Sequence, residues 1–229
     1  MTTPAHERAR QDRAGPVRLQ RDRPIIFSAS MVQALLAGRK SQTRRLVKSR
    51  RRPSLFDGTW SDDYVLDPGN ASWREREMPA AAGDRLWVKE GFARVGDNFD
   101  DIHACPDLRV HAYYRADDVC PEHSRWRSPI FMPRWASRLT LIVEAVKVER
   151  LQNISEEDAV AEGLKPDTCG GQLMWDPGPP HGYFGDPRVA YRMLWSDIHG
   201  PAAWDANPWI CAISFKCVQS NVDALGSAA

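Results

Sequence analysis

The chain has 229 residues and carries 31 Lys and Arg against 30 Asp and Glu, a formal net charge of +1. This length suffices for one domain with its own hydrophobic core, and the near-neutral balance does not demand a polyanionic partner. No apolar run approaches membrane-spanning length, and no signal-peptide segment is recognisable. Five cysteines, an odd number, indicate a reducing cytoplasmic setting rather than a disulfide framework.

Composition divides the chain into a domain and its flanks. Residues 1–23 are polar and charged without apolar periodicity, so we expect a disordered lead-in there. Residues 24–218 are expected to form the domain, and residues 219–229 a flexible tail. Tracts rich in Pro and Gly predict long inserts near 48–79, 91–110 and 165–187. The last insert resembles a flexible flap, either a lid over a site or a tolerated surface insertion.

The first predicted elements are a short helix and a strand. Ser30, with Gln33 three residues later, predicts a capping box that begins a helix over Met31–Ala37. Gly38 supplies the left-handed residue that commonly ends a helix. Ser41–Val47 then predicts a strand that the chain enters through a tight turn.

Later elements follow the same signals. A helix is predicted from Ser155, with Asp158 completing its capping box, to Gly163, and another from Asp186 to Gly200. Strands are predicted at Arg85–Glu90, His111–Arg115, Leu139–Val148 and Cys211–Val218. Scattered strands with helices between them favour an α+β mixed barrel over a parallel βαβ sheet.

A lysine and a hydroxyl are close together after the first helix. Lys40 lies in the turn and Thr43 just inside the strand, so their side chains can converge beside the helix end. A lysine beside a hydroxyl can remove its proton and make it nucleophilic. The alternative is a solvated basic turn that only links two elements, and spacing alone favours it because most lysines lie at surfaces.

The residues of this turn also carry a family resemblance. Gly38, Lys40, Thr43 and Arg45 fit the glycine-x-lysine-x-x-threonine-x-arginine run that opens the ASCH family, in its phage-associated branch. Four later segments resemble the same family: Gly83–Glu90, Met132–Arg138, Val148–Ala159 and Trp204–Trp209. The resemblance spans about residues 24–218 and implies a PUA-like β-barrel flanked by short helices, here with long loop insertions.

The resemblance extends to amidohydrolases that remove the acetyl group from N4-acetylcytidine. It implies that Lys40 is the base, Thr43 the nucleophile and Glu162 the acid that protonates the leaving amine. Desolvation and nearby arginines are expected to lower the pKa of Lys40. The backbone N–H groups of Gly38–Ser41 are candidates for an oxyanion hole. No metal or cofactor is implied, and the expected partner is a modified nucleoside or nucleobase.

Glu162 would end the helix that begins after Ser155, at the negative end of the helix dipole. That position raises the pKa of a carboxyl group if the site is also partly buried, as a general acid requires. The alternative is an exposed glutamate at a helix end. Glu156 and Glu157 compete for the role, but first-turn positions explain them better.

A nucleobase site also needs aromatic faces and polar contacts. The chain has nine tryptophans, several of which a core can absorb. Asn207 has an amide suited to a cytosine edge, although Asn207-Pro208 also favours a turn. The candidate substrate-binding residues are Ser41, Arg45, Trp87, Lys89, Glu90, Tyr114, Asn207 and Trp209.

Two other readings of the chain remain open. The pairs His103/Cys105 and Cys120/His123 offer zinc-type ligands, but their spacing matches no standard zinc motif and we expect no metal. The basic cluster Arg44–Arg52 favours an alternative function, an RNA-binding PUA-like module or a ribonuclease. A phage accessory protein that acts only through protein contacts is a third class.

Overall fold

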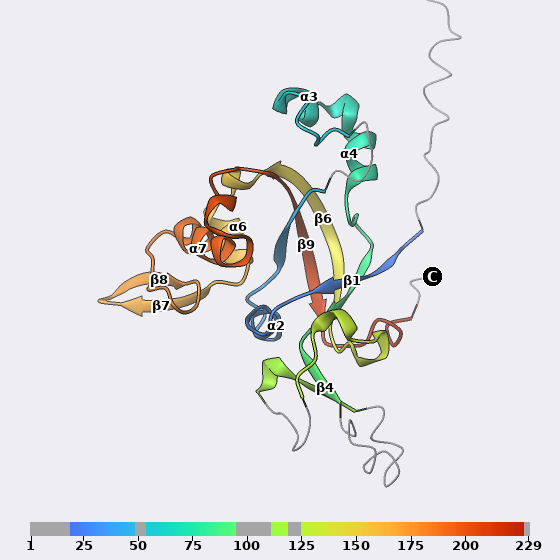
Figure 1. The fold of residues 1–229 in the computed structure, drawn as a ribbon, viewed down its shortest axis with the longest axis vertical. Helices are drawn as coiled ribbons and strands as arrows, with labels where there is room; N and C mark the ends of the chain where they lie inside the picture. Colours follow the sequence, from blue (N-terminus) through green and yellow to red (C-terminus); the bar gives the residue numbers. More distant parts are fainter. Residues whose placement is uncertain (1–18, 49–53, 95–110, 119–124, 227–229) are drawn as a thin grey trace, which may run out of the picture.

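The computed structural model describes residues 19–48, 54–94, 111–118 and 125–226, and its centre is a five-stranded mixed sheet (Figure 1). The strands, in spatial order, are β1 (Asp22–Ile26), β3 (Arg85–Lys89), β6 (Thr140–Arg150), β9 (Trp209–Val218) and β2 (Gln42–Leu46). β1 and β3 run parallel, and every other neighbouring pair is antiparallel. The architecture is therefore α+β, as the sequence predicts.

Short helices and two hairpins surround this sheet. The hairpins are β4 (Phe92–Arg94) with β5 (Ala112–Tyr114), and β7 (Lys165–Cys169) with β8 (Gln172–Asp176). The helices are α2 (Ala29–Leu36), α3 (Asp62–Leu66), α4 (Ala71–Glu77), α6 (Glu156–Ala161) and α7 (Pro187–His199). Short 3-10 turns lie at Pro68–Asn70, Arg115–Asp117, Pro129–Phe131, Arg134–Ala136, Leu151–Asn153 and Pro201–Ala203. Within the described ranges, no helix has the length and apolarity needed to cross a membrane.

Most predicted caps are confirmed, but the first is shifted. The Ser155 side chain accepts from the Asp158 amide at 3.1 Å, and the Asp186 side chain accepts from the Arg188 amide at 2.8 Å. The cap of α2, however, is Ser28, whose side chain accepts from the Met31 amide at 3.3 Å. Ser28 has the extended backbone that a cap requires, so the helix starts earlier than predicted and Ser30 lies in its first turn.

The sheet curls without closing through backbone pairing among the described residues. β1 and β2 are its two edges, so backbone pairing closes no barrel in this part of the chain, and the PUA-like β-barrel stays a prediction. A side chain links the edges instead, because Nη2 of Arg45 on β2 donates to the Ile26 carbonyl of β1 at 2.7 Å. The Arg45 guanidinium also lies 5.0 Å from the ring centroid of Phe27.

Both faces of the sheet are covered. On one face α2 packs Val32 and Leu35 into the main core, which includes Val88, Leu141 and Ile213. On the other face α6 and α7 pack against β9, and Figure 1 shows these two helices together on one side of the sheet. As a result β2 is covered on both sides at Gln42–Arg44, all of which are buried. Charged groups in such a position must find partners.

The insert at 48–79 contains more structure than the sequence predicts. Ser61 caps α3 by accepting from the Tyr64 amide at 3.3 Å, and α4 follows after a short turn. Val65 on α3 is fully buried against Leu55 and Trp209. The irregular tract predicted here is therefore wrong over the two helices, which cover one end of the sheet (Figure 1).

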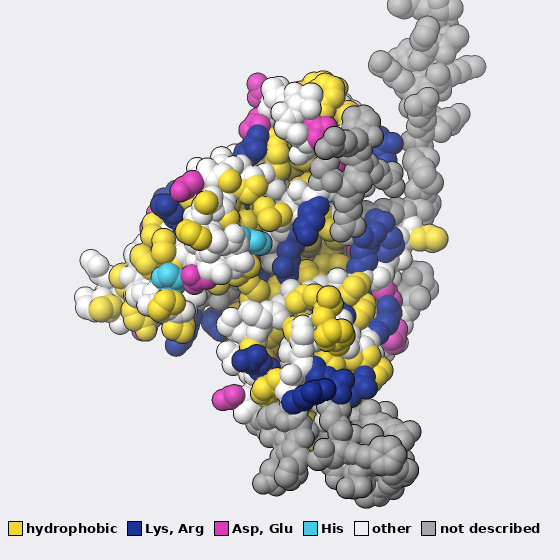
Figure 2. All heavy atoms as spheres, in the orientation of Figure 1, with side chains coloured by type: hydrophobic (Ala, Val, Ile, Leu, Met, Phe, Trp, Pro, Cys, Tyr) yellow, Lys and Arg dark blue, Asp and Glu magenta, His cyan; other side chains and the backbone are white. Residues whose placement is uncertain are grey.

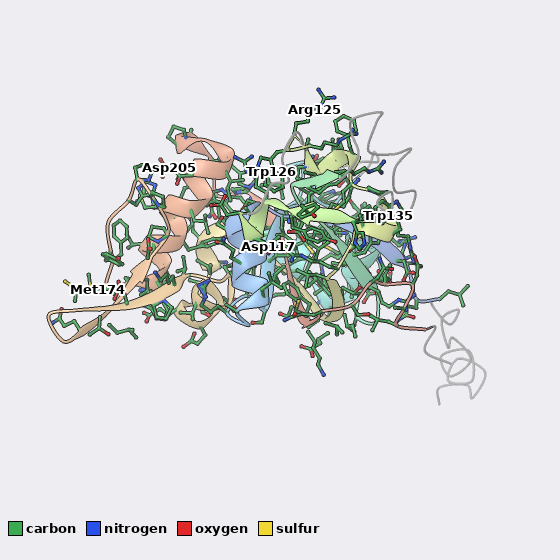
Figure 3. The ribbon with its side chains drawn as sticks, turned by 90° about the horizontal axis from the view of Figure 1, so that it is seen from below. Asp117, Arg125, Trp126, Trp135, Met174 and Asp205 are labelled. Carbon is green, nitrogen blue, oxygen red and sulfur yellow. The ribbon has the colours of Figure 1, made fainter. Side chains whose placement is uncertain are left out.

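The expected flap is an ordered hairpin that projects from the α6–α7 side, with Met174 near its outer end (Figure 3). Gly170 and Gly171 form its turn with φ values of 60° and 81°, a conformation that glycine adopts without strain. At its base, the backbones of Trp175 and Phe184 exchange two hydrogen bonds of 2.7 and 3.0 Å.

The fold extends past both expected boundaries. β1 begins at Asp22, whose carboxylate pairs with Arg85 at 2.7 Å. After β9, Val222 is fully buried and the Asn221 amide donates to the Ser137 carbonyl at 2.8 Å. The segment up to residue 226 therefore packs on the domain, where the sequence predicts a flexible tail.

Gly163 provides a test of the packing behind Lys40. Its φ is 99°, and a Cβ there would lie 2.9 Å from the Cβ atoms of both Ala34 and Lys40. We expect Gly163→Ala to lower the free energy of unfolding, measured in urea, by more than about 2 kcal/mol. The new Cβ would overlap Ala34 and Lys40, and alanine is also strained at this positive φ. The control Gly83→Ala has a φ of 85° and open space, so it should cost about 1 kcal/mol. Equal losses of unfolding free energy in the two variants would contradict the close approach of Gly163 to Ala34 and Lys40.

Candidate active site

The turn after α2 places Lys40 beside the C-terminal end of α6. Gly38, with a φ of 69°, ends the helix as predicted, and the amides of Arg39 and Lys40 both donate to the Ala34 carbonyl. The Ser41 amide then donates to the Ala161 carbonyl at 2.9 Å. Backbone hydrogen bonds therefore hold the turn against α6 before any side chain contributes.

The same bonds exclude the expected oxyanion hole. The Gly38 amide donates to the Leu35 carbonyl, so every N–H from Gly38 to Ser41 has a backbone acceptor. An oxyanion hole needs N–H groups that are free to donate to the developing negative charge. This prediction is wrong, because the turn uses its donors to close α2 and to join α6.

Lys40 and Glu162 meet as predicted. Nζ of Lys40 donates to the Glu162 carbonyl oxygen and to its Oε2, both at 2.7 Å. The two residues are 2% and 5% exposed, so the pair is closed to solvent. Burial lowers the pKa of Lys40, an effect that the Glu162 carboxylate opposes and the neighbouring Arg45 and Arg44 charges reinforce. The alternative of a solvated lysine is thus excluded, as is an exposed Glu162.

Arg44 is the centre of the surrounding charge network. Its Nη2 lies 2.7 Å from Asp158 Oδ2 and 3.0 Å from Glu149 Oε1, and its Nη1 lies 3.3 Å from Glu162 Oε1. Lys147 contacts the other oxygen of Glu149 at 2.6 Å. Two buried cations, Lys40 and Arg44, and the exposed Lys147 thus face three carboxylates.

Sequence reasoning missed the role of Arg44, Glu149 and Asp158. Alternation along the strand does place Arg44 with Gln42 on the face opposite Thr43. The Gln42 side chain, on this same face, accepts from Arg44 Nη1 at 2.5 Å and donates to Asp158 Oδ1 at 3.0 Å. Strand alternation therefore indicated on which face of β2 Arg44 lies. It did not indicate that Glu149, Asp158 and Glu162 are its partners.

Thr43 lies on the other face of β2. It shares that face with Arg45, and the ring of Phe27 lies 5.0 Å from the Arg45 guanidinium and 5.7 Å from Lys40 Nζ. Thr43 is buried, and no hydrogen bond joins its hydroxyl to Lys40 among the described residues. Lys40 therefore lies between the Glu162 carboxylate and the Phe27 ring.

Several residues predicted to bind substrate belong to a second ionic cluster. Glu90 is buried against Arg138 at 2.9 Å, and burial raises the pKa of its carboxyl group against the effect of that arginine. The Arg138 guanidinium also pairs with Asp117 and lies 3.9 Å from the ring centroid of Tyr114. These contacts give Glu90 and Tyr114 structural partners away from Lys40.

The remaining candidates also have other partners. Asn207, with a φ of 41°, follows the turn at 204–206 and precedes β9, and its side-chain Oδ1 accepts from the Gln152 amide at 2.9 Å. Trp209 is buried under Arg150, and Lys89 lies 5.5 Å from the ring of Trp87. Ser41 is exposed, and Arg45 alone of this group contacts the surroundings of Lys40 through Phe27.

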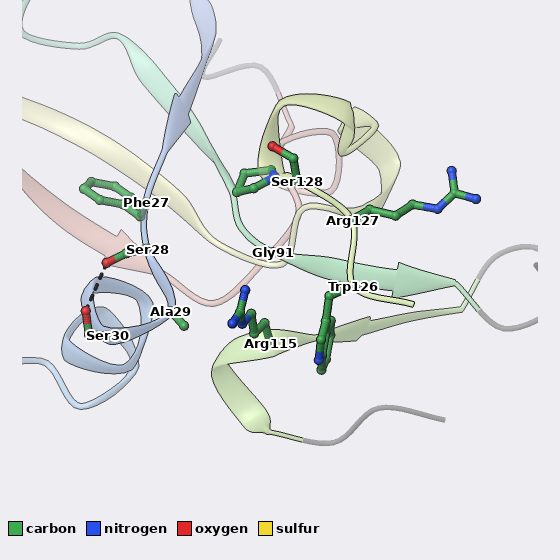
Figure 4. Close-up of a pocket in the computed structure, with 10 residues that line it drawn as sticks. Phe27, Ser28, Ala29, Ser30, Gly91, Arg115, Trp126, Arg127 and Ser128 are labelled. Carbon is green, nitrogen blue, oxygen red and sulfur yellow. Dashed lines mark hydrogen bonds between the residues drawn. The ribbon is translucent and has the colours of Figure 1, made fainter. Parts of the chain in front are cut away.

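A cavity of about 490 Å³ opens beside Phe27, but Lys40, Thr43 and Glu162 do not line it (Figure 4). Its walls come from the start of α2, the residue after β5 and the segment 126–129. Phe27 is common to both places, since it is among the lining residues while its buried ring, directed away from Arg115 and Trp126 in Figure 4, lies 5.7 Å from Lys40 Nζ.

The structure also bears on the other readings of the chain. Arg44 is buried in its ion pairs and Arg45 is bonded to Ile26, so neither is available to a phosphate backbone as the cluster Arg44–Arg52 requires. Residues 49–53 lie outside the described chain, as do His103, Cys105, Cys120 and His123. In the ranges that are described, no group of His, Cys, Asp and Glu has the arrangement of a metal site.

The Lys40–Glu162 pair can be tested by a double-mutant cycle. Lys40→Met leaves the Glu162 carboxylate buried with Arg44 as its one remaining cation, so we expect a loss of about 3–5 kcal/mol in unfolding free energy. Adding Glu162→Gln should recover at least 1 kcal/mol of that loss, by an order-of-magnitude estimate for a coupled buried pair. Urea unfolding measures both. The exposed Lys216→Met serves as control, and additive losses would contradict the pairing.

Comparison of the chain with protein-family models, with curated proteins and with solved structures gives no match in any of the three. Functional reasoning about this site therefore depends on its own geometry and on the resemblance of its motifs.

Proposed function

We propose that this protein is an amidohydrolase that removes an acyl group from the exocyclic nitrogen of a cytosine derivative such as N4-acetylcytidine. The proposal includes a PUA-like fold of the ASCH type, which the five-stranded sheet and the Arg45–Ile26 contact between its edges support. Two residues that the resemblance pairs functionally, Lys40 and Glu162, are far apart in the chain and 2.7 Å apart in the structure. No metal ion or cofactor is required.

The observation that carries the proposal is the way in which Glu162 holds Lys40. A lysine ammonium has three N–H groups, and Glu162 accepts from two of them through its carbonyl oxygen and its Oε2. Loss of the third proton leaves a neutral amine whose lone pair occupies the remaining direction. The desolvated lysine is thus an oriented base, and it needs no rearrangement of its hydrogen bonds to become one.

The reaction follows from this arrangement. Lys40 takes the proton of the Thr43 hydroxyl, and the Thr43 oxygen bonds to the acyl carbon. The carbon–nitrogen bond then breaks, the proton passes to the leaving amino group, and an acyl ester on Thr43 remains. Water attacks this ester, again with Lys40 as base, and releases the carboxylic acid. Arg45, which shares a strand face with Thr43, supplies positive charge toward the tetrahedral oxygen.

Glu162 takes part in the proton transfer through Lys40. Both of its carboxylate oxygens accept hydrogen bonds, from Lys40 at 2.7 Å and from Arg44 at 3.3 Å. In our proposal the proton moves between the Lys40–Glu162 pair and the leaving nitrogen, while Arg44 holds the carboxylate in place. Lys40 and Glu162 thus share the general-acid role that the family resemblance implies for Glu162 alone.

Hydrolysis of N4-acetylcytidine to cytidine, followed by ultraviolet absorbance, tests the proposal. We expect Lys40→Met and Glu162→Gln each to lower kcat/KM by about a hundredfold or more, the usual contribution of acid–base groups. Thr43→Val removes the nucleophile at almost constant volume and should abolish turnover. Lys216→Met and Thr168→Val, at exposed positions, are the matched controls. Full activity of Thr43→Val, or no turnover of any acylcytidine by folded wild-type protein, would refute the mechanism.

The pH dependence of the reaction provides a second test. Because the base must be unprotonated, kcat/KM should rise with pH and level off at the pKa of Lys40. Burial holds that pKa below the ordinary lysine value of 10.5, so the plateau should begin below this pH. Lys40→Arg keeps a cation there but should show no such plateau, since arginine stays protonated. A wild-type rate independent of pH between 6 and 10.5 would contradict Lys40 as the base.

A further inference from the structure

The cavity beside Phe27 is lined by groups that the proposed chemistry does not use. Ser28 and Ser30 at the start of α2 form one wall, and Arg115 and Trp126 face them from two other segments (Figure 4). Gly91 forms part of the lining, where a Cβ would lie 3.2 Å from the Cβ of Arg115. The close approach of these two segments therefore brings the arginine to the cavity.

The lining is positively charged. Arg115 is exposed and makes no ion pair within the described ranges, and the cavity has no acidic residue in its walls. Arg127 also belongs to the lining, but its guanidinium is directed away from the cavity (Figure 4). Figure 2 shows Lys and Arg side chains gathered over this end of the molecule, near the position of β4 in Figure 1. The charge favours an anionic ligand.

Backbone donors add to that preference. The amides of Ala29 and Ser30, at the start of α2, donate no hydrogen bond to any described residue, as is usual for a first helical turn. The Ser28 and Ser30 hydroxyls lie 3.0 Å apart at the same edge of the cavity. A helix N-terminus beside an arginine and two hydroxyls suits a phosphate group.

Trp126 supplies the other half of a nucleotide site. Its indole is half-buried and lies beside Arg115 in the lining, with Arg127 directed away from it (Figure 4). A nucleobase stacks on such a ring, a contact that is typically insensitive to base identity. The volume of about 490 Å³ is within the usual range for small-molecule sites, which is roughly 300–1,000 Å³.

We propose that this cavity binds a nucleoside monophosphate, with the phosphate on Arg115 and the start of α2 and the base against Trp126. Phe27 belongs to the lining, and its ring lies 5.7 Å from Lys40 Nζ. We take the base of the bound nucleotide to be cytosine. This choice of base rests on the proposed hydrolase function, while the phosphate site does not.

Calorimetric titration of the full chain with CMP and with cytidine tests the site, and neither ligand carries an acyl group that could be hydrolysed. We expect CMP to bind about tenfold more tightly or better, the ratio that one charge-assisted hydrogen bond supports. Arg115→Gln should bring the two affinities together, and Trp126→Leu should weaken both ligands alike. Arg192→Gln, at an exposed position on α7, should leave both unchanged.

Each result decides a different point. Equal affinity of wild-type protein for CMP and cytidine, or an unchanged ratio in Arg115→Gln, would overturn the phosphate site. Binding of a short oligonucleotide without binding of CMP would also overturn it, because the site would then belong to a polymer. AMP binding far more tightly than CMP would support the nucleotide cavity but break its link to the proposed cytosine chemistry. Binding of CMP without hydrolysis of any N4-acylcytidine would leave the cavity proposal supported and refute the hydrolase alone.

Discussion

The structure depends on placing two adjacent cations, Lys40 and Arg44, inside the protein. Both are closed to solvent, and burial of an unpaired charge is too costly for a domain to tolerate. Glu162, Asp158 and Glu149 supply the compensating charge from α6 and from the central strand β6. This requirement fixes α6 against β2 and thereby positions the end of α6 next to the turn after α2.

That position gives β2 two chemically different faces. Toward α6 and α7 the strand carries the ion pairs of Arg44, while toward Phe27 it carries Thr43 and Arg45. Lys40, just before the strand, contacts Glu162 and also lies near the Phe27 ring. Lys40 is thus oriented by the carboxylate and also lies near the strand face that carries Thr43, which is the arrangement that our proposed hydrolase requires.

Local signals predicted much of this arrangement, and long-range packing accounts for the rest. The left-handed glycine Gly38 and the caps Ser155 and Asp186 are short-range features, so the sequence shows them directly. The choice of Lys40 and Glu162 as site residues came from a family resemblance and not from periodicity, and their contact is seen only in the structure. Three features depend on contacts between distant segments, which a single sequence does not reveal. They are the hydrogen bond from the turn to α6, the open sheet and the partners of Arg44.

Titration of the Lys40 ammonium itself tests the central claim most directly. Carbon-detected NMR of the lysine Cε atoms across a pH series, assigned by comparison with Lys40→Arg, reports its protonation in the folded protein. We predict a midpoint below 10.5, with the hydrogen bond from Lys40 to Glu162 retained on both sides of it. A Lys40 that keeps its proton up to the pH at which the protein unfolds would contradict the oriented base and leave the ion pair with a purely structural role.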